Sequence, residues 1–432
     1  MQIKRQLRGY LMIAAFLFGA QVARAQRTDA LGTYTPYSLY GIGDLEQQGN
    51  AITKSMGGIS AGIRDARYIN YSNVASITER DTLSFLFDFG LKSNNIYNKD
   101  SKNHSAYNTF NINNFAFSAP IYHKSALVVG IAPFSNIGYK FETTETDDAL
   151  VAKYGDIKYR KYGDGSINQI FAGAAMNFFK NFSFGLKGIY YFGDLVNHSD
   201  IDFGSSGNLR TVETGWDYEA NGFAAEAGLQ YFKKFKKDYT FTAGASYRFK
   251  SRLSGTTKRY AYVYDSSIAD TVVTTKSIKH VTIPAVLTLG VSIRKGDKWM
   301  AGIDYQRQDW SNTSFSATPG VDFSPVTESS IKAGFEYIPN KYDIRYYMKR
   351  VTYRAGVHYE NTYVKLNGKQ IKTYGMSLGV SFPVFRLNNS LNFTVDFGQR
   401  GSTKNNLVKE NYVQFIMSLS LHDIWFIKPR YE

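Results

Sequence analysis

Six histidines are the residues of this sequence best suited to acid–base or metal chemistry. They are scattered along the chain, at His104, His123, His198, His280, His358 and His422. No two of them stand at the short spacing that metal ligands on one element require. The chain has no cysteine, so thiolate ligands, disulfides and a lipidated N-terminus are excluded. Nucleophile-elbow, HExxH, Walker and dinucleotide-binding motifs are also missing. We therefore predict neither a metal site nor a cofactor.

His358 stands two residues before Glu360, and this pair could form half of an acyl-hydrolase site. Such a site needs a serine at a defined position, and the sequence nominates none. A lone histidine beside a tyrosine on a strand is usually structural. We interpret the chain as a protein without enzyme activity, and a lipase assay on detergent-solubilised protein tests the alternative.

The N-terminus has the pattern of a secretory signal. Three basic residues stand within the first eight, residues 11–20 are apolar, and Ala23-Arg24-Ala25 forms a small-x-small cleavage site. The sequence therefore predicts a signal peptide at residues 1–25 and an exported chain.

Composition points to a membrane partner rather than to nucleic acid. The formal net charge is +15, and an exported basic chain meets anionic lipid headgroups before it meets nucleic acid. Mean hydropathy is only −0.32, yet aromatic residues reach 16%, with 33 Tyr and 31 Phe. Many aromatic residues with weak overall hydropathy are typical of a transmembrane β-barrel.

Alternating apolar and polar residues predict about fourteen strands. In the sharpest example, Leu391, Phe393, Val395 and Phe397 alternate with polar or small residues. The predicted strands are 82–91, 109–118, 126–141, 167–178, 182–192, 221–232, 239–249, 282–293, 299–309, 329–337, 353–363, 374–382, 391–399 and 411–421. We predict an all-β, antiparallel transmembrane barrel at 82–421.

Connection lengths support a barrel in the bacterial outer membrane over a soluble β-sandwich. Long polar links are predicted at 92–108, 142–166, 193–220, 250–281 and 310–328, and they alternate with short turns. Outer-membrane barrels have long external loops and short periplasmic turns. The link at 338–352 is an exception, because it is long for a periplasmic turn. Aromatic residues near strand ends fit interfacial girdles; they are Tyr139, Phe141, Tyr190, Tyr191, Phe192, Tyr247, Phe249, Trp299, Tyr359 and Tyr363.

The residues before and after the barrel differ from its strands. Residues 26–81 lack alternation, although residues 45–52 could form a short helix. A barrel of about fourteen strands is too wide for its own side chains to fill, so we predict that this segment is a plug, or hatch, inside the lumen. The alternative is a flexible arm. Residues 422–432 are predicted to form a periplasmic tail.

The chain resembles the FadL-like family of outer-membrane transporters for long-chain fatty acids and other hydrophobic compounds. The likeness rests on residues 69–76 (Ile-Asn-Tyr-Ser-Asn-Val-Ala-Ser), 130–134 (Gly-Ile-Ala-Pro-Phe) and the closing stretch 398–412. Val74 departs from the usual Asn-Pro-Ala of the family. The resemblance implies a fourteen-stranded barrel, an N-terminal hatch, and lateral release of the ligand where the third strand is kinked.

The residues themselves suggest where such a function would lie. Proline in a strand interior removes a ladder donor, so Gly130, Pro133 and Phe134 are candidates for a lateral opening, unless Pro133 lies at the strand end. Candidate ligand-binding residues are Tyr37, Tyr40, Met56, Ile59, Ile63 and Tyr68. Arg64 and Arg67 are candidates for pairing with a ligand headgroup, or else for bridging to wall acids such as Asp88.

The predicted function is therefore uptake of a hydrophobic compound across the outer membrane. The ligand class stays open among fatty acid, aromatic hydrocarbon, quinone and lipid. Two alternatives remain: a non-specific porin, and a structural subunit of an outer-membrane secretion or surface complex with protein partners.

Overall fold

The computed structural model describes residues 31–424, except 81–83, 101–102, 123, 204–208, 237, 266–267, 314, 316–321 and 385–387. The signal peptide predicted at 1–25 lies outside the described residues, and so do residues 425–432 of the predicted tail. Within the described ranges, no helix is long and apolar enough to cross a membrane.

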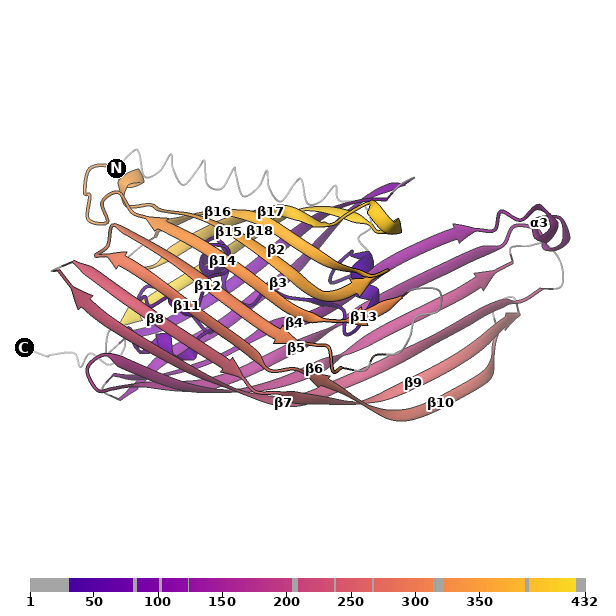
Figure 1. Ribbon diagram of the computed structural model, residues 1–432, viewed down its shortest axis with the longest axis horizontal. Coiled ribbons are helices and arrows are strands. Elements are labelled where there is room, and N and C mark those ends of the chain that lie inside the picture. Colours follow the sequence, from indigo (N-terminus) through magenta and orange to yellow (C-terminus); the bar gives the residue numbers. More distant parts are fainter. Residues whose placement is uncertain are drawn as a thin grey trace, which may run out of the picture.

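Fourteen antiparallel strands close into a barrel in the described part of the chain, which confirms the predicted fold (Figure 1). Most wall strands are single elements: β2 (Ser84–Lys99), β3 (His104–Tyr122), β4 (Ser125–Thr144), β5 (Lys158–Phe178), β6 (Phe182–Asp202), β7 (Thr211–Phe235), β12 (Trp299–Asp309), β15 (Thr352–Leu366), β16 (Lys369–Pro383), β17 (Ser390–Gly401) and β18 (Lys409–Ile424). The others consist of two successive elements: β8 (Tyr239–Arg248) with β9 (Ser251–Asp265), β10 (Ile268–Ile283) with β11 (Val286–Lys295), and β13 (Phe323–Pro325) with β14 (Thr327–Tyr337). Pairing of β18 with β2 closes the ring.

The wall is apolar outside and polar inside. On β17, Phe393 and Phe397 are 39% and 40% exposed on the outer face, whereas Asn392 and Thr394 are buried on the inner face. Successive strand residues point to opposite faces, so the same alternation recurs around the ring. A closed sheet satisfies its own backbone hydrogen bonds, which is the condition for crossing lipid with strands.

Aromatic residues mark both edges of the apolar band. Trp299, Tyr337 and Tyr353 are register partners at the end with the short turns, and Tyr359 is the partner of Tyr374 at the other end. Such belts are typical of membrane interfaces.

Three residues predicted for these girdles are buried on the inside instead: Tyr139, Tyr191 and Tyr363. A register shift of one residue between Pro133 and Ser135 of β4 explains Tyr139, whereas Tyr363 lies inside the irregular stretch of β15 between Asn361 and Lys365. An irregularity of one residue moves the following side chains to the opposite face.

On one side of the ring the wall rises well beyond the apolar band. The sequence predicts polar links at 142–166, 193–220 and 250–281, but β5, β6, β7, β9 and β10 run through most of these residues. We call this extension the projecting sheet; it comprises residues 138–144, 158–166, 193–202, 211–220, 251–265 and 268–283, and α3 (Asp148–Tyr154) lies at its tip (Figure 1). Its outer face is largely polar, and its buried face mixes apolar residues such as Tyr218 and Leu253 with small and polar ones, so its sequence lacks the regular alternation by which strands are recognised.

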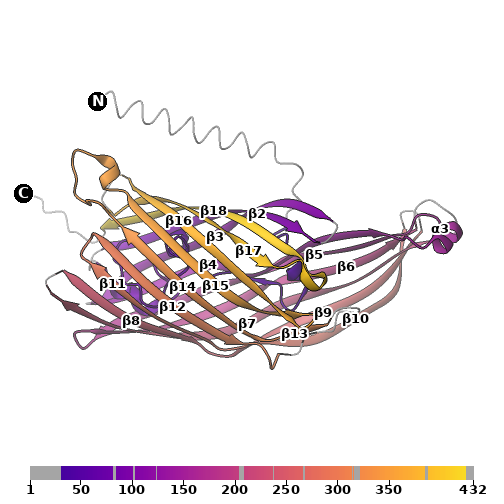
Figure 2. The ribbon, with the colours of Figure 1, turned by 45° about the horizontal axis from the view of Figure 1, so that its top comes forward.

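Residues 31–80, which we call the inner segment, lie within the ring (Figures 1 and 2). They contain η1 (Pro36–Leu39), β1 (Asp44–Leu45), α2 (Ala51–Lys54) and η2 (Val74–Thr78). The helix expected at 45–52 begins only at Ala51, because the Asn50 side chain accepts a hydrogen bond from the Thr53 N–H and caps it there.

Candidate functional site: the lumen and the split in the wall

The barrel wall is split between β3 and β4. These strands pair only from Tyr122↔Ser125 as far as Phe115↔Ile131. Their other ladders, β2 with β3 and β4 with β5, continue to the far ends of the strands. Two strand edges are therefore left without a wall partner over this stretch, and their backbone groups must be satisfied in another way.

Pro133 lies where the two strands separate. It stands in the interior of β4, not at its end, and the ladder with β5 shifts register between Pro133 and Ser135. Gly130 still pairs with β3, and Phe134 turns inward to pack on Tyr191, with ring centroids 4.6 Å apart. The three residues predicted for the strand kink thus lie at the split.

The inner segment covers the exposed edge of β4. Its two-residue strand β1 pairs with β4. The Thr35 N–H donates to the Gly138 carbonyl at 3.0 Å, and the Glu46 N–H donates to the Phe134 carbonyl at 2.9 Å. A Cβ atom on Gly138 would lie 1.9 Å from the Thr33 carbonyl oxygen, so only glycine permits this close approach.

The inner segment also contacts β3. The Asn111 Nδ2 donates to the Gly32 carbonyl at 2.8 Å, and Tyr34 stacks on Tyr107 with ring centroids 3.9 Å apart. Residues 32–46 therefore lie between the two separated strands and bond to both.

Glu46 ties the two sides of the split together. Its carboxylate forms a buried ion pair with Lys92 of β2 and accepts a hydrogen bond from Asn136 Nδ2 of β4 at 2.8 Å. One side chain of the inner segment thus links wall strands on either side of the missing ladder.

The structure separates the six candidate ligand-binding residues into two groups. Met56, Ile59, Ile63 and Tyr68 pack with two neighbours into one cluster in which every member is 3% exposed or less. Tyr37 and Tyr40 belong to a different and larger cluster. There the Tyr37 hydroxyl donates to the Val408 carbonyl, and Tyr40 packs on Phe323 at 5.2 Å.

The two candidate headgroup-binding arginines are engaged with protein groups. The Arg64 Nε bonds Glu79 at 2.8 Å, and its guanidinium lies 3.9 Å from the Phe232 ring centroid. Arg67 bonds Asp65 at 2.5 Å and also pairs with Glu336 of β14. Of the two roles considered for Arg67, the geometry favours bridging to a wall acid, although that acid is Glu336 and not Asp88.

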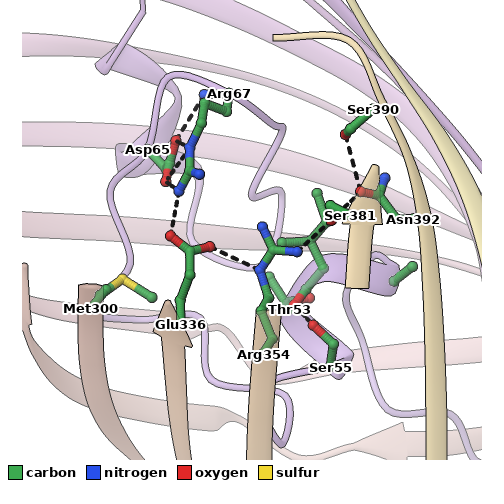
Figure 3. Close-up of polar contacts among 12 residues, drawn as sticks. Thr53, Ser55, Asp65, Arg67, Met300, Glu336, Arg354, Ser381, Ser390 and Asn392 are labelled. Carbon is green, nitrogen blue, oxygen red and sulfur yellow. Dashed lines mark hydrogen bonds and ion pairs between the residues drawn. The ribbon is translucent and has the colours of Figure 1, made fainter. Parts of the chain in front are cut away.

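A chain of polar contacts extends from Arg67 into the wall (Figure 3). Glu336 accepts from Arg67 and from the Arg354 Nε, the latter at 2.8 Å. Arg354 continues to Ser381, which bonds Asn392. Every charged side chain in this network is buried and contacts a group of opposite charge, as a low-dielectric interior requires.

Charged residues line two cavities among the described residues. One cavity of about 90 Å³ is bordered by Lys187, Glu226 and Arg248, and another of about 110 Å³ by Lys54, Lys92 and Asp396, among others. These linings suit water or ions better than a hydrocarbon chain. No group of three or more acidic or histidine residues in the described part of the chain could hold a metal ion.

Sequence reasoning did not nominate these buried charges as functional. Lys187 lies between Leu186 and Gly188, and Glu226 lies between two alanines. Each stands at an inward position of an otherwise regular alternation, which is the signal that identifies a lumen-facing charge.

Comparison with known proteins identifies the fold and the family. Three solved structures match with a TM-score of 0.54: the toluene transporter TbuX of Ralstonia pickettii, at 17% identity over 87% of this chain and 98% of that one; the toluene transporter TodX of P. putida, at 16% over 88% and 100%; and a FadL homologue of Pseudomonas aeruginosa, at 13% over 88% and 99%. At these identities the likeness concerns the fold, and it confirms the FadL-like architecture. No curated protein matches the sequence.

The sequence itself matches the BamG family over residues 5–432, which is nearly its full length. The chain forms a closed barrel with an apolar outer face and FadL-like architecture, and the family match covers nearly all of it. The chain is an outer-membrane β-barrel that belongs to the BamG family.

Proposed function

We propose that this barrel is a structural subunit of a larger outer-membrane complex and that its lumen is permanently closed by the inner segment. The proposal rests on the distribution of buried hydrogen bonds and ion pairs between the inner segment and the wall, which we call ties. They reach strands all around the ring: Lys92 on β2, Lys187 on β6, Gln230 on β7, Arg294 on β11, Asp304 on β12, Glu336 on β14, Ser377 on β16 and Thr394 on β17.

These ties resist displacement of the inner segment. The Asp304 carboxylate accepts from the backbone N–H groups of Ser60 and Ala61 at 2.6 and 2.8 Å, and Arg294 bonds Asp65 at 2.6 Å. Leaving one partner of a buried ion pair alone costs about 3–5 kcal/mol. Several such contacts would have to break together to open the lumen.

The projecting sheet offers surface for a protein partner. It adds ordered strands outside the apolar band, and its outer face carries Tyr162 stacked on His198 and an ion-pair cluster around Arg160. A rigid surface of this kind lowers the entropy cost of association, because little has to be ordered on binding.

Mild extraction of the full chain from its own membranes tests this proposal. We expect a complex of fixed stoichiometry that contains another outer-membrane protein and survives high salt, and we expect no stable ion current from the purified barrel in planar bilayers. Extraction of the chain alone, as a monomer, together with uptake of a lipophilic probe, would refute it.

Uptake of a hydrophobic compound with lateral release is the second candidate, and the split at Pro133 favours it. A hydrophobic ligand that passed through the wall directly into lipid would avoid a free-energy cost of about 0.8 kcal/mol for each methylene exposed to water. Release by this route requires residues 32–46 to leave the split.

A reversible lock separates the two candidates. Leu45 and Ser135 are register partners of β1 and β4, and the chain has no natural cysteine, so a Leu45→Cys/Ser135→Cys disulfide would fix the inner segment to the wall. If uptake is the function, toluene or oleate transport into proteoliposomes stops on oxidation and returns on reduction. If the barrel is a closed subunit, neither state transports, and the partner is retained in both.

A further inference from the structure

The link between β14 and β15 is the one turn at its end of the barrel that the sequence marks as too long, and the functions proposed above do not use it. We call residues 338–351 the β14–β15 loop. Its base is anchored by Ile338 and Val351, which are 2% and 0% exposed. Between these two residues the chain stands out from the rim as a separate knob (Figure 2).

Internal hydrogen bonds fix the shape of this loop. The Asn340 N–H donates to the Lys349 carbonyl at 2.8 Å. The Asp343 carboxylate accepts from the N–H groups of Arg345 and Tyr346 at 2.9 and 2.6 Å, and these bonds lower the pKa of Asp343. Asp343 is therefore charged near neutral pH and holds the turn that leads into the short helix η3 (Tyr347–Lys349).

Two tyrosine hydroxyls brace the loop against neighbouring parts of the rim. Tyr342 donates to Asp297 in the β11–β12 turn at 3.1 Å, and Tyr347 donates to the Pro383 carbonyl at the end of β16 at 2.8 Å. The knob is thus held on both sides.

This ordered knob exposes large apolar groups. Ile344 is 100% exposed, and Tyr346 and Met348 are 54% and 57% exposed. Isoleucine without any contact at the tip of a braced loop gains nothing from the fold itself. Burial against an apolar surface outside the chain would therefore be favourable for this side chain.

Cations surround these apolar groups. The loop carries four cations, Lys341, Arg345, Lys349 and Arg350, and one acid, Asp343. Lys349 lies 3.5 Å from Asp343, and Lys341 lies 3.5 Å from Asp297 of the neighbouring turn, so positive charge remains in excess. The Lys349 ammonium lies 4.6 Å from the Tyr346 ring centroid, and the Arg350 guanidinium lies 4.9 Å from that of Tyr347. Aromatic rings with adjacent cations suit the boundary between acyl chains and phosphate headgroups.

The loop continues the aromatic belt at the edge of the apolar band. It begins directly after Tyr337 and ends two residues before Tyr353, and these two tyrosines are register partners in that belt. Outer-membrane barrels place their short turns on the periplasmic side, so the loop lies level with the headgroups of the periplasmic leaflet.

We propose that the β14–β15 loop is a membrane-surface anchor that inserts Ile344, Tyr346 and Met348 into the periplasmic leaflet and pairs Arg345 and Lys349 with anionic phospholipid. Its apolar tip, its excess of positive charge and its continuity with the girdle all match this one surface. The anchor would hold the rim at a fixed depth in the membrane.

Depth measurement on the full chain tests the anchor. A nitroxide spin label is attached to the Ile344→Cys variant, which has no other cysteine. The labelled protein is placed in nanodiscs of phosphatidylethanolamine and phosphatidylglycerol. We expect this label to be accessible to oxygen and protected from a water-soluble nickel chelate. A matched label at Lys236→Cys, in the short β7–β8 turn, should be open to nickel. Equal nickel access at both sites would overturn the proposal, whatever else the loop contacts.

A charge variant tests the lipid class. In the wild-type background, protection of the Ile344→Cys label should increase with the fraction of phosphatidylglycerol over phosphatidylcholine, and the Arg345→Gln/Lys349→Gln variant should lose most of this dependence. Both residues are exposed, so the barrel should fold in the variant as in the wild type, which a heat-modifiable gel band checks. A wild-type label that is insensitive to phosphatidylglycerol would overturn the assignment to anionic lipid.

Discussion

Glu336 shows how single side chains hold the inner segment in place. Its buried carboxylate contacts three guanidinium groups, those of Arg67 from the inner segment and of Arg294 and Arg354 from the wall. Asp65 supplies a second carboxylate to this cluster. Because charges of both signs are present together, none is left uncompensated away from water.

Replacement of Glu336 by alanine should destabilise the barrel strongly. Three cations would lose their shared partner in a buried site, for which we expect a loss of about 3–5 kcal/mol in the free energy of unfolding. Urea titration in detergent, followed by the heat-modifiable gel band, measures it. The control is Glu142→Ala, which removes an exposed acid 3.5 Å from Arg160 and should cost less than about 1 kcal/mol. Equal effects of the two substitutions would contradict the role of the buried cluster.

Residue roles were only partly predictable from the sequence. The alternation around Lys187 and Glu226 assigns both residues to the lumen. Their mutual contact at 2.8 Å depends on strand register, which cannot be inferred from one sequence alone. Tyr37 and Met56 look alike as apolar residues of the inner segment, yet they belong to different clusters. The path of an irregular chain decides that difference, because it has no period from which to infer facing positions.

At the scale of elements, the split between β3 and β4 is the feature that most distinguishes this barrel from a uniform cylinder. An open sheet edge at membrane depth is tolerated only where protein covers it. Here β1 and the residues beside it supply the missing partner for β4. The inner segment thus completes the edge of the wall at the split.

Removal of the Glu46 carboxylate should loosen this cover. Hydrogen bonds to charged groups contribute about 1.5–3 kcal/mol each, so Glu46→Ala should expose the split roughly ten- to a hundredfold more often. A cysteine at Ser135, which is fully buried beneath the cover, reports this exposure through its rate of reaction with a polar maleimide. Glu145→Ala, one residue beyond the end of β4, tested with the same reporter, should leave the rate unchanged. An unchanged rate in Glu46→Ala would show that Glu46 does not hold the cover in place.

The elements themselves were largely predictable, for a physical reason. Where one strand face meets lipid and the other meets a polar interior, alternation is forced on the sequence, as in β12, whose limits match the predicted 299–309. In β10 the residues from 270 to 280 are nearly all exposed, so nothing enforces a period there. In β9 one face is buried, but it carries Ser251, Gly255 and Thr257 beside Leu253, so the alternation is one of burial and not of hydropathy. The split was indicated by Pro133, since proline cannot continue a ladder.

At the scale of the whole molecule, the barrel and the projecting sheet are separable in energetic terms. The apolar band is complete without β9 and β10, because β8 and β11 pair with each other from Tyr239↔Lys295 to Arg248↔Val286. Membrane insertion should therefore depend on the band, and the association proposed for this chain should depend on the sheet.

Shortening the β9–β10 hairpin tests this separation. Gly255 and Lys279 are register partners, so an Asn-Gly turn can join them directly and delete residues 256–278. We expect the shortened chain to reach the outer membrane, to keep its heat-modifiable band, and to remain closed to ions in planar bilayers, because every tie between the inner segment and the wall is retained. The same chain should lose most of its co-extracted partner. A shortened barrel that keeps its partner would place the contact elsewhere on the molecule, and one that fails to fold would show that the sheet supports the wall. Because folding and partner retention are measured on the same sample, the two results can be told apart.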